Sequence, residues 1–318
     1  MSNFQVYRKV LSFSLVMFLV DILKLAAVVG LAILGFVLMS QSTDLALIGL
    51  AVGLLVGIIV ACLIGMFVSN RLKAAQIAIM VKGVTEGALP DHCFKEGFNE
   101  VKGRFASIFA FIMITNAIKR IFRQIGRTIN KIGTAIGGQT GNAITSAVDS
   151  AVQTLLAYLC DCCLGWVIYR KDQNAAKSAC EGAVIFFKHG KTLIRNIGRI
   201  FGMGFLSFLL IGGAFFGVSY LVFMQFPDMF VTLSNAIIAT GEEVPAFISD
   251  TNMLMIYVAA ILAVVLWSIV HSVLIRPFIL VGVLRNFIAA GQKDMPSEQD
   301  FQEVANKSPR FAKLSQSI

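Results

Sequence analysis

Residues 200–225 read IFGMGFLSFLLIGGAFFGVSYLVFMQ, a run of uncharged and mostly apolar side chains. About 20 such residues are enough to cross the hydrocarbon core of a bilayer as a helix. Three further runs are also mostly apolar, at 11–39, 45–69 and 253–275, and the first of them carries the charges Asp21 and Lys24. The last of them is followed by Pro277, which is expected to break or kink the helix. The pattern therefore predicts four transmembrane helices.

The composition of the whole chain agrees with this prediction. Of 318 residues, 57% are hydrophobic and only 14% are charged. An average soluble domain has about 25% charged residues, so a water-soluble globule and a disordered chain are both excluded. We expect an all-α, polytopic integral membrane protein, and the lipid bilayer is its first expected partner.

The distribution of Lys and Arg predicts the orientation of the spans. No Lys or Arg occurs between Arg199 and Arg276, although acidic residues do. The acidic residues are Asp228, Glu242, Glu243 and Asp250. Because basic residues are retained on the cytoplasmic side, the loop 226–252 is expected outside the cell. Both termini are then cytoplasmic, and we favour the plasma membrane over an organelle.

These boundaries divide the chain, which is expected to form a single membrane domain over residues 1–318. Residues 11–69 form a helical hairpin, and 70–199 form a cytoplasmic or interfacial middle region. Residues 200–275 form a second hairpin with the exterior loop, and 276–318 form a cytoplasmic tail.

Two shorter apolar segments lie in the middle region, at 105–118 and 143–168. If both crossed the membrane, the basic segment 119–131 would lie outside, against the positive-inside rule. We therefore expect both to be membrane-embedded or interfacial without a full crossing, and two crossings remain the alternative. The segment 119–131 alternates Lys and Arg with isoleucine, which is typical of an amphipathic helix on anionic lipid rather than of nucleic-acid binding.

Glycines recur every fourth residue in the second run, at Gly49, Gly53 and Gly57. This spacing leaves one helix face smooth, so that another backbone can approach closely. Packing within one chain is the favoured interpretation, and a dimer interface is the alternative.

Four side chains in the spans are candidates for solute binding, and Lys24 is the charged neighbour of one of them. Asp21 and Lys24 share a helix face. Charge inside a membrane indicates function, and an intrahelical ion pair is the alternative interpretation. Trp267 and His271 are one turn apart, and Tyr257 lies near the same face. Such a stripe can hold an organic cation by cation–π attraction; aromatic packing or an interfacial belt is the alternative. The predicted substrate-binding residues are Asp21, Tyr257, Trp267 and His271.

The sequence contains no pattern of residues that is typical of an enzyme active site. The three histidines are far apart, and no paired carboxylates or nucleophile motif occurs. The cysteine run at 160–163 lacks the second ligand pair of a zinc site, so we interpret it as packed or acylated thiols. No catalytic activity, cofactor or metal is expected.

Several segments between residue 89 and the C-terminus resemble the choline transporter-like family of solute carriers. The matching segments are Leu89-Pro-Asp, Lys102-Gly-Arg-Phe-Ala, Cys160-Asp-Cys-Cys-Leu-Gly-Trp166, Arg195-Asn-Ile-Gly-Arg199 and Phe278-Ile-Leu-Val-Gly-Val-Leu284. The resemblance implies a membrane transporter core with cytoplasmic termini and choline, or a related organic cation, as a candidate substrate.

Two classes of function remain beside transport. The first prediction is a membrane transporter or permease for a small solute. A non-transporting membrane scaffold or assembly protein would instead use the glycine faces and the basic segment to bind partners. An oligomeric ion channel is the third alternative.

Overall fold

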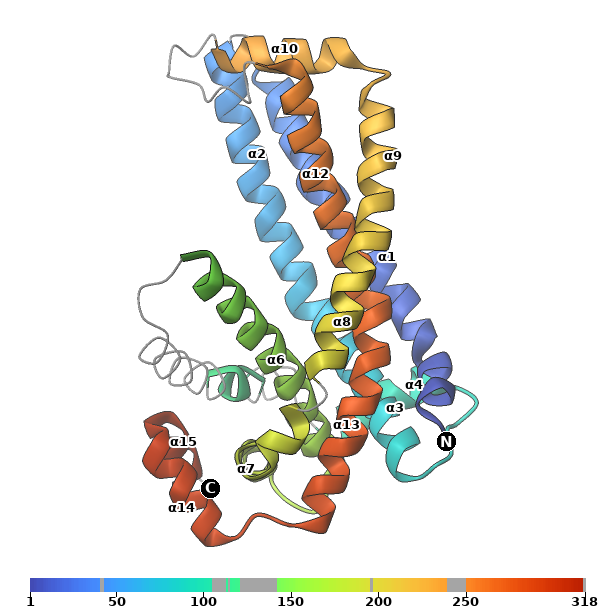
Figure 1. Cartoon of the computed structure of the whole chain (residues 1–318), viewed down its shortest axis with the longest axis vertical. Coiled ribbons are helices and arrows are strands. Elements are labelled where there is room, and N and C mark those ends of the chain that lie inside the picture. The colour runs from blue at the N-terminus through green and yellow to red at the C-terminus, as the bar shows by residue number, and fades with distance from the viewer. Residues whose placement is uncertain are drawn as a thin grey trace. The chain divides into compact units, whose positions relative to one another are not determined.

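The computed structural model describes residues 1–40, 43–104, 113, 115–120, 142–194, 197–238 and 250–316. Every regular element in these ranges is a helix (Figure 1). Four helical stretches are long and apolar enough to cross a membrane. They are Asn3–Leu38, Leu45–Thr85, Gly202–Phe223 and Thr251–Lys293. The predicted all-α class with four spanning helices is confirmed.

Three of the four stretches contain a π-helical turn, labelled η. The spans and the segments continuous with them are α1 (Asn3–Leu38), α2 (Thr43–Ile64), η1 (Gly65–Ser69), α3 (Asn70–Thr85), α8 (Ile197–Ser207), η2 (Phe208–Gly212), α9 (Gly213–Phe223), α12 (Thr251–Val270), η3 (His271–Ile275) and α13 (Arg276–Lys293). The other helices are α4 (Cys93–Arg104), α6 (Asn142–Tyr169), α7 (Ala175–Ile194), α10 (Pro227–Ile238), α14 (Glu298–Lys307) and α15 (Pro309–Ser315).

The helices run further than the apolar runs predicted. The second stretch continues to Thr85 and the fourth to Lys293, each well past its π-helical turn. Pro277 does not end the fourth helix, which runs continuously from Thr251 to Lys293. It follows the π-helical turn η3 directly, and a local π-helical turn can satisfy the backbone groups that a proline leaves free in a membrane helix.

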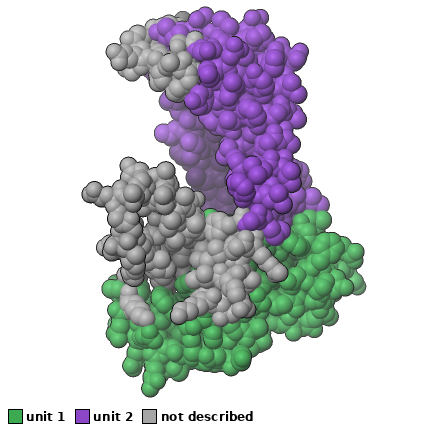
Figure 2. All heavy atoms as spheres, viewed as in Figure 1, with its two compact units in different colours: residues 1–13, 71–201, 276–318 green, residues 14–70, 202–275 purple. Residues whose placement is uncertain are grey.

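The chain forms two compact units (Figure 2). Unit 1 contains residues 1–13, 71–201 and 276–318, and unit 2 contains residues 14–70 and 202–275. Unit 2 holds most of the apolar spans, and unit 1 holds most of the charged residues that pair with one another.

Unit 2 exposes large apolar side chains along its helices. Leu19, Leu55, Leu210 and Ile261 are among them, on α1, α2, η2 and α12. Such surfaces are rare on soluble monomers and are covered by lipid in membrane proteins. The exposed faces therefore support a membrane setting for unit 2.

The glycine series brings α1 and α2 into backbone contact within unit 2. A Cβ atom on Gly49 would lie 2.1 Å from the carbonyl oxygen of Gly35, and one on Gly53 would lie 2.1 Å from that of Leu31. A Cβ atom on Gly57 would come within 2.7 Å of a Cα atom of α1. Only glycine fits at these positions. The predicted close packing inside one chain is confirmed.

The predicted exterior loop 226–252 contains the helix α10, which the charge pattern did not indicate. In Figure 1 this helix lies across the ends of α9 and α12. Phe230 of α10 is buried against Leu254 and Met255 of α12. The acidic pair at 242–243 lies outside the described residues, and the sidedness of the loop stays a prediction.

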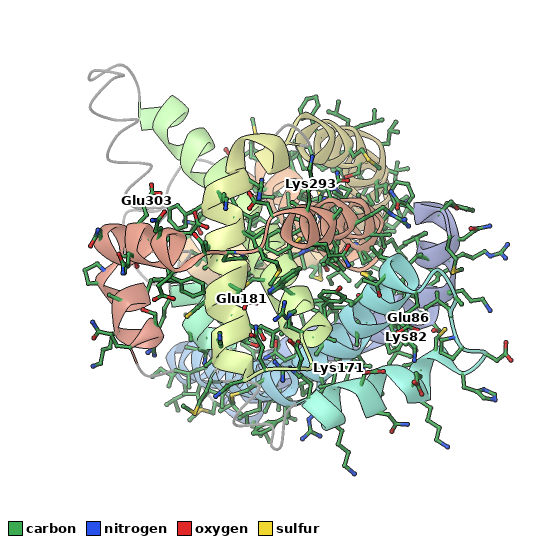
Figure 3. All side chains as sticks on the ribbon, turned by 90° about the horizontal axis from the view of Figure 1, so that it is seen from below. Lys82, Glu86, Lys171, Glu181, Lys293 and Glu303 are labelled. Carbon is green, nitrogen blue, oxygen red and sulfur yellow. The ribbon has the colours of Figure 1, made fainter. Side chains whose placement is uncertain are left out.

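Unit 1 is built around α6, α7 and α13. Their buried side chains form its core: Tyr158, Trp166, Val184, Ile185, Leu284 and Phe287. Figure 3 shows Glu181 of α7 in the midst of these helices, whereas Lys82 and Glu86 lie together at the end of α3. The indole N–H of Trp166 donates to Glu181 at 3.0 Å, which satisfies this buried carboxylate.

The two middle segments are only partly visible. Residues 143–168 lie within α6, whose last part, Ala157–Tyr169, is a short apolar helix. Most of 105–118, and the part of the basic segment from 121 to 131, lie outside the described residues. Whether either segment crosses the membrane therefore stays a prediction.

Candidate functional site

Three side chains of unit 2 gather around Trp267. The indole N–H of Trp267 donates to the Ser207 hydroxyl at 3.2 Å. The Phe208 ring meets the Trp267 ring edge-on, with centroids 5.1 Å apart, and the His271 ring lies 5.3 Å from it. We call these residues, Ser207, Phe208, Trp267 and His271, the Trp267 cluster.

The residues of the cluster lie at or near the starts of two π-helical turns. Ser207 is the last residue of α8 and Phe208 the first of η2, while His271 is the first of η3. A π-helical turn adds a residue to one turn, and such turns are frequent at functional sites. Ser207 is buried, and its hydroxyl also donates to the Gly204 carbonyl at 2.7 Å. The polar groups of the cluster are thus held in place within an apolar span.

Asp21 and Lys24 form an ion pair on α1. Lys24 Nζ lies 2.6 Å from Asp21 Oδ1, and both side chains are about three-quarters buried. A Cβ atom built on Gly65, the first residue of η1, would lie 4.0 Å from Lys24 Nζ. The interpretation as an intrahelical pair is confirmed, and a role of Asp21 in substrate binding stays a prediction.

Tyr257 stands apart from the Trp267 cluster. It precedes Trp267 by ten residues, which is about 15 Å along a helix, and the residue is 47% exposed. Of the predicted aromatic stripe, the structure brings together Trp267 and His271. Ser207 and Phe208 were missed, because one serine and one phenylalanine in a long apolar run give no periodic signal.

A second polar group lies in unit 1, around Asp161. The Asp161 carboxylate is 7% exposed, and each of its oxygens has a cation. Lys73 Nζ lies 2.6 Å from Oδ1, and a terminal nitrogen of Arg276 lies 2.7 Å from Oδ2. The guanidinium of Arg276 also lies over the Tyr158 ring, 5.4 Å from its centroid. We call Lys73, Tyr158, Asp161 and Arg276 the Asp161 cluster.

The charges of the Asp161 cluster keep Asp161 ionised, whereas burial keeps the neighbouring Cys160 thiol protonated. Burial by itself would raise the pKa of Asp161, but Lys73 and Arg276 outweigh it and hold the pKa below its ordinary value. Burial raises the pKa of the adjacent Cys160 thiol to about 12. Cys160 is therefore a neutral thiol at physiological pH and a poor nucleophile or metal ligand.

The cysteine run belongs to the core of unit 1. Cys162 and Cys163 are buried, and the Cys163 thiol donates to the Ala179 carbonyl at 3.3 Å. Among the residues that the structure describes, no group of three His, Cys, Asp or Glu side chains could hold a metal ion. The run thus provides packed thiols in the described part of the chain.

Arg104 joins three segments of unit 1. Its Nε donates to the Val167 carbonyl at 2.7 Å and one terminal nitrogen donates to the Gln173 carbonyl at 2.8 Å. The other terminal nitrogen donates to the Ser178 hydroxyl at 3.1 Å. The planar guanidinium suits three such divergent acceptors, which an ammonium group cannot reach together. Arg104 is therefore a structural anchor between α4 and the turn from α6 to α7.

Replacing Arg104 with lysine is expected to lower the free energy of unfolding by about 2 kcal/mol. The ammonium group cannot make all three hydrogen bonds of the guanidinium, and each hydrogen bond to a charged group is worth about 1.5–3 kcal/mol. Unfolding in detergent micelles by titration with dodecyl sulfate measures this change. The exposed neighbour Lys102 supplies the control, Lys102→Arg, which should unfold like the parent chain. Equal stability of Arg104→Lys and the parent would contradict the anchor role.

Unit 1 also has an open cleft of about 420 Å³. The lining residues are Trp166, Tyr169, Arg170, Asp172, Gln292 and Met295. Inside it, Arg170 is paired with Asp172 at 2.9 Å, and the Gln292 amide donates to the Tyr169 hydroxyl at 2.7 Å. Most polar groups of this cleft thus pair with one another, but Arg170 Nε is buried and has no hydrogen-bond partner within the described residues.

Comparison with known proteins gives no further support for an identity. No protein-family model matches the chain. Neither the curated proteins nor the solved structures contain a match. The resemblance to choline transporter-like proteins therefore stays a prediction, and the function is argued below from geometry.

Proposed function

We propose that the chain is a membrane permease for a small solute, with choline or a related organic cation as the candidate substrate. The observation behind this proposal is the Trp267 cluster, in which an aromatic pair, a histidine and a serine lie at or near two π-helical turns inside apolar spans. Transporters commonly bind substrate where spanning helices are interrupted.

The chemistry of the cluster suits a weakly hydrated cation. Trp267 and Phe208 offer ring faces, and a cation over an indole face gains about 2 kcal/mol when water is excluded. The hydrogen bond from Trp267 to Ser207 fixes the orientation of the indole. In this proposal Trp267 contacts the substrate, and Ser207 acts as a positioning residue.

The test is uptake of labelled choline by vesicles that contain the purified chain. Trp267→Ala is expected to raise the half-saturating concentration by about tenfold to thirtyfold, because the cation–π contact is lost. Trp267→Phe keeps an aromatic face and loses only the bond to Ser207, so a smaller rise, about threefold, is expected. Ile261→Ala, on the exposed face of the same helix, is the matched control.

Two outcomes would count against the proposal. Uptake by the Trp267→Ala chain with parental kinetics would remove the cluster from the substrate path. Uptake by the parent chain no faster than by empty vesicles would reject choline transport itself and favour the other function classes.

A non-transporting membrane scaffold is the second candidate. The backbone contact between α1 and α2 favours it, because the atoms around Gly49 and Gly53 leave no room for a polar path between these two helices. A channel formed by several copies is the third, and the mass of the detergent-solubilised particle tests it.

A further inference from the structure

The Asp161 cluster contains more positive than negative charge. The Asp161 carboxylate forms ion pairs with Lys73 and Arg276. Each of its two oxygens already has one of these cations as its partner. A third cation, Lys119, acts on both Lys73 and Cys160. Lys73 and Arg276 thus share one carboxylate, while Lys119 adds to the positive charge that acts on Lys73, and an anion would relieve this repulsion.

Two buried donors of the cluster lack acceptors. Arg276 Nε and the Tyr158 hydroxyl have no hydrogen-bond partner within the described ranges. Buried polar groups are normally satisfied, so each such group calls for an explanation. The cations themselves remain accessible, since Lys73 is 35% and Arg276 26% exposed, while Asp161 is covered. An incoming acceptor can thus reach the exposed parts of the Lys73 and Arg276 side chains from the surface, whereas Arg276 Nε and the Tyr158 hydroxyl are buried.

The position of the cluster along the chain identifies the source of the anion. Arg71, Lys73 and Arg276 are the first basic residues after the apolar runs 45–69 and 253–275. Basic residues at the ends of spans lie at the level of the lipid headgroups. Anionic headgroups there attract clustered Lys and Arg. A phosphate of the surrounding leaflet is the nearest anion of this kind.

We propose that Lys119 and the cations of the Asp161 cluster bind the phosphate of an anionic phospholipid headgroup. The phosphate oxygens accept from Lys73, Arg276 and Lys119, and Asp161 holds two of these cations in position beneath it. The proposal does not depend on transport, because it concerns unit 1 and a lipid that need not move.

Native mass spectrometry of the full chain in neutral detergent tests the proposal by counting bound lipids. Phosphatidylglycerol is expected to bind about tenfold more tightly than phosphatidylcholine. Lys119→Gln is expected to weaken phosphatidylglycerol binding about fivefold, the effect of one lysine at an anionic membrane surface. Lys119 is exposed, so this variant should fold. Lys177→Gln removes an exposed lysine of α7 and is the matched control.

Competition with inorganic phosphate at constant ionic strength separates the two sources of phosphate. Displacement of phosphatidylglycerol by phosphate, but not by chloride, would support recognition of the phosphate group. Equal affinity for the two lipids, or parental affinity of Lys119→Gln, would overturn the proposal. Binding of inorganic phosphate without any phosphatidylglycerol would overturn the lipid as its source. None of these results depends on choline uptake, so the two proposals fail separately.

Discussion

Replacing Asp161 with asparagine is expected to lower the free energy of unfolding by about 3–5 kcal/mol, because Lys73 and Arg276 would then repel each other without their shared counter-ion. The shape of the side chain is conserved, so the loss measures charge rather than packing. Titration with dodecyl sulfate, followed by circular dichroism, gives the change. This is the largest effect expected from any single polar substitution in unit 1.

Two further variants test whether the loss of stability comes from the ion pairs of Asp161. Asp172→Asn removes a carboxylate that is 65% exposed and should cost less than about 1 kcal/mol. Combining Asp161→Asn with Lys73→Gln removes one of the two unpaired cations, and part of the lost stability should return. A parental unfolding curve for Asp161→Asn would mean that the cluster does not hold its helices together.

Replacing Gly53 with alanine is expected to separate α1 from α2 and to lower the free energy of unfolding by about 3 kcal/mol. The new methyl group would lie 2.1 Å from the Leu31 carbonyl oxygen, a backbone atom that cannot turn aside. The same titration measures the change. The loss should grow further for Gly53→Val, whose side chain is larger.

Gly30 provides the matched control for this prediction. It lies on the same hairpin, but no heavy atom is within 4 Å of the place where its Cβ would stand. Gly30→Ala should therefore leave stability unchanged or raise it by up to about 1 kcal/mol through helix propensity. Equal changes in the free energy of unfolding for Gly30→Ala and Gly53→Ala would show that close backbone contact is not the reason why residue 53 is glycine.

The spans, the glycine contact and the Asp21–Lys24 pair could be predicted because each depends on neighbours in the sequence. Apolar length defines a span, a four-residue glycine period defines a smooth face, and two charges three residues apart share a helix face. Local pattern was sufficient in all three cases, and the structure confirms each of them.

The π-helical turns and the partners of Asp161 could not be predicted in this way. Arg276 lies 115 residues from Asp161, so their pairing depends on how distant helices pack. Likewise, Ser207 acquires its partner Trp267 from another helix, 60 residues away. A single sequence contains no record of such contacts.

The contact between α1 and α2 also bears on how the chain is made. Its closest approaches involve residues within the first 57 positions, so no later part of the chain is needed to form them. Domains of larger proteins generally fold from the N-terminus during synthesis. The first two helices can therefore pair as soon as both have left the ribosome and entered the bilayer, and they offer the later helices a rigid surface to assemble on.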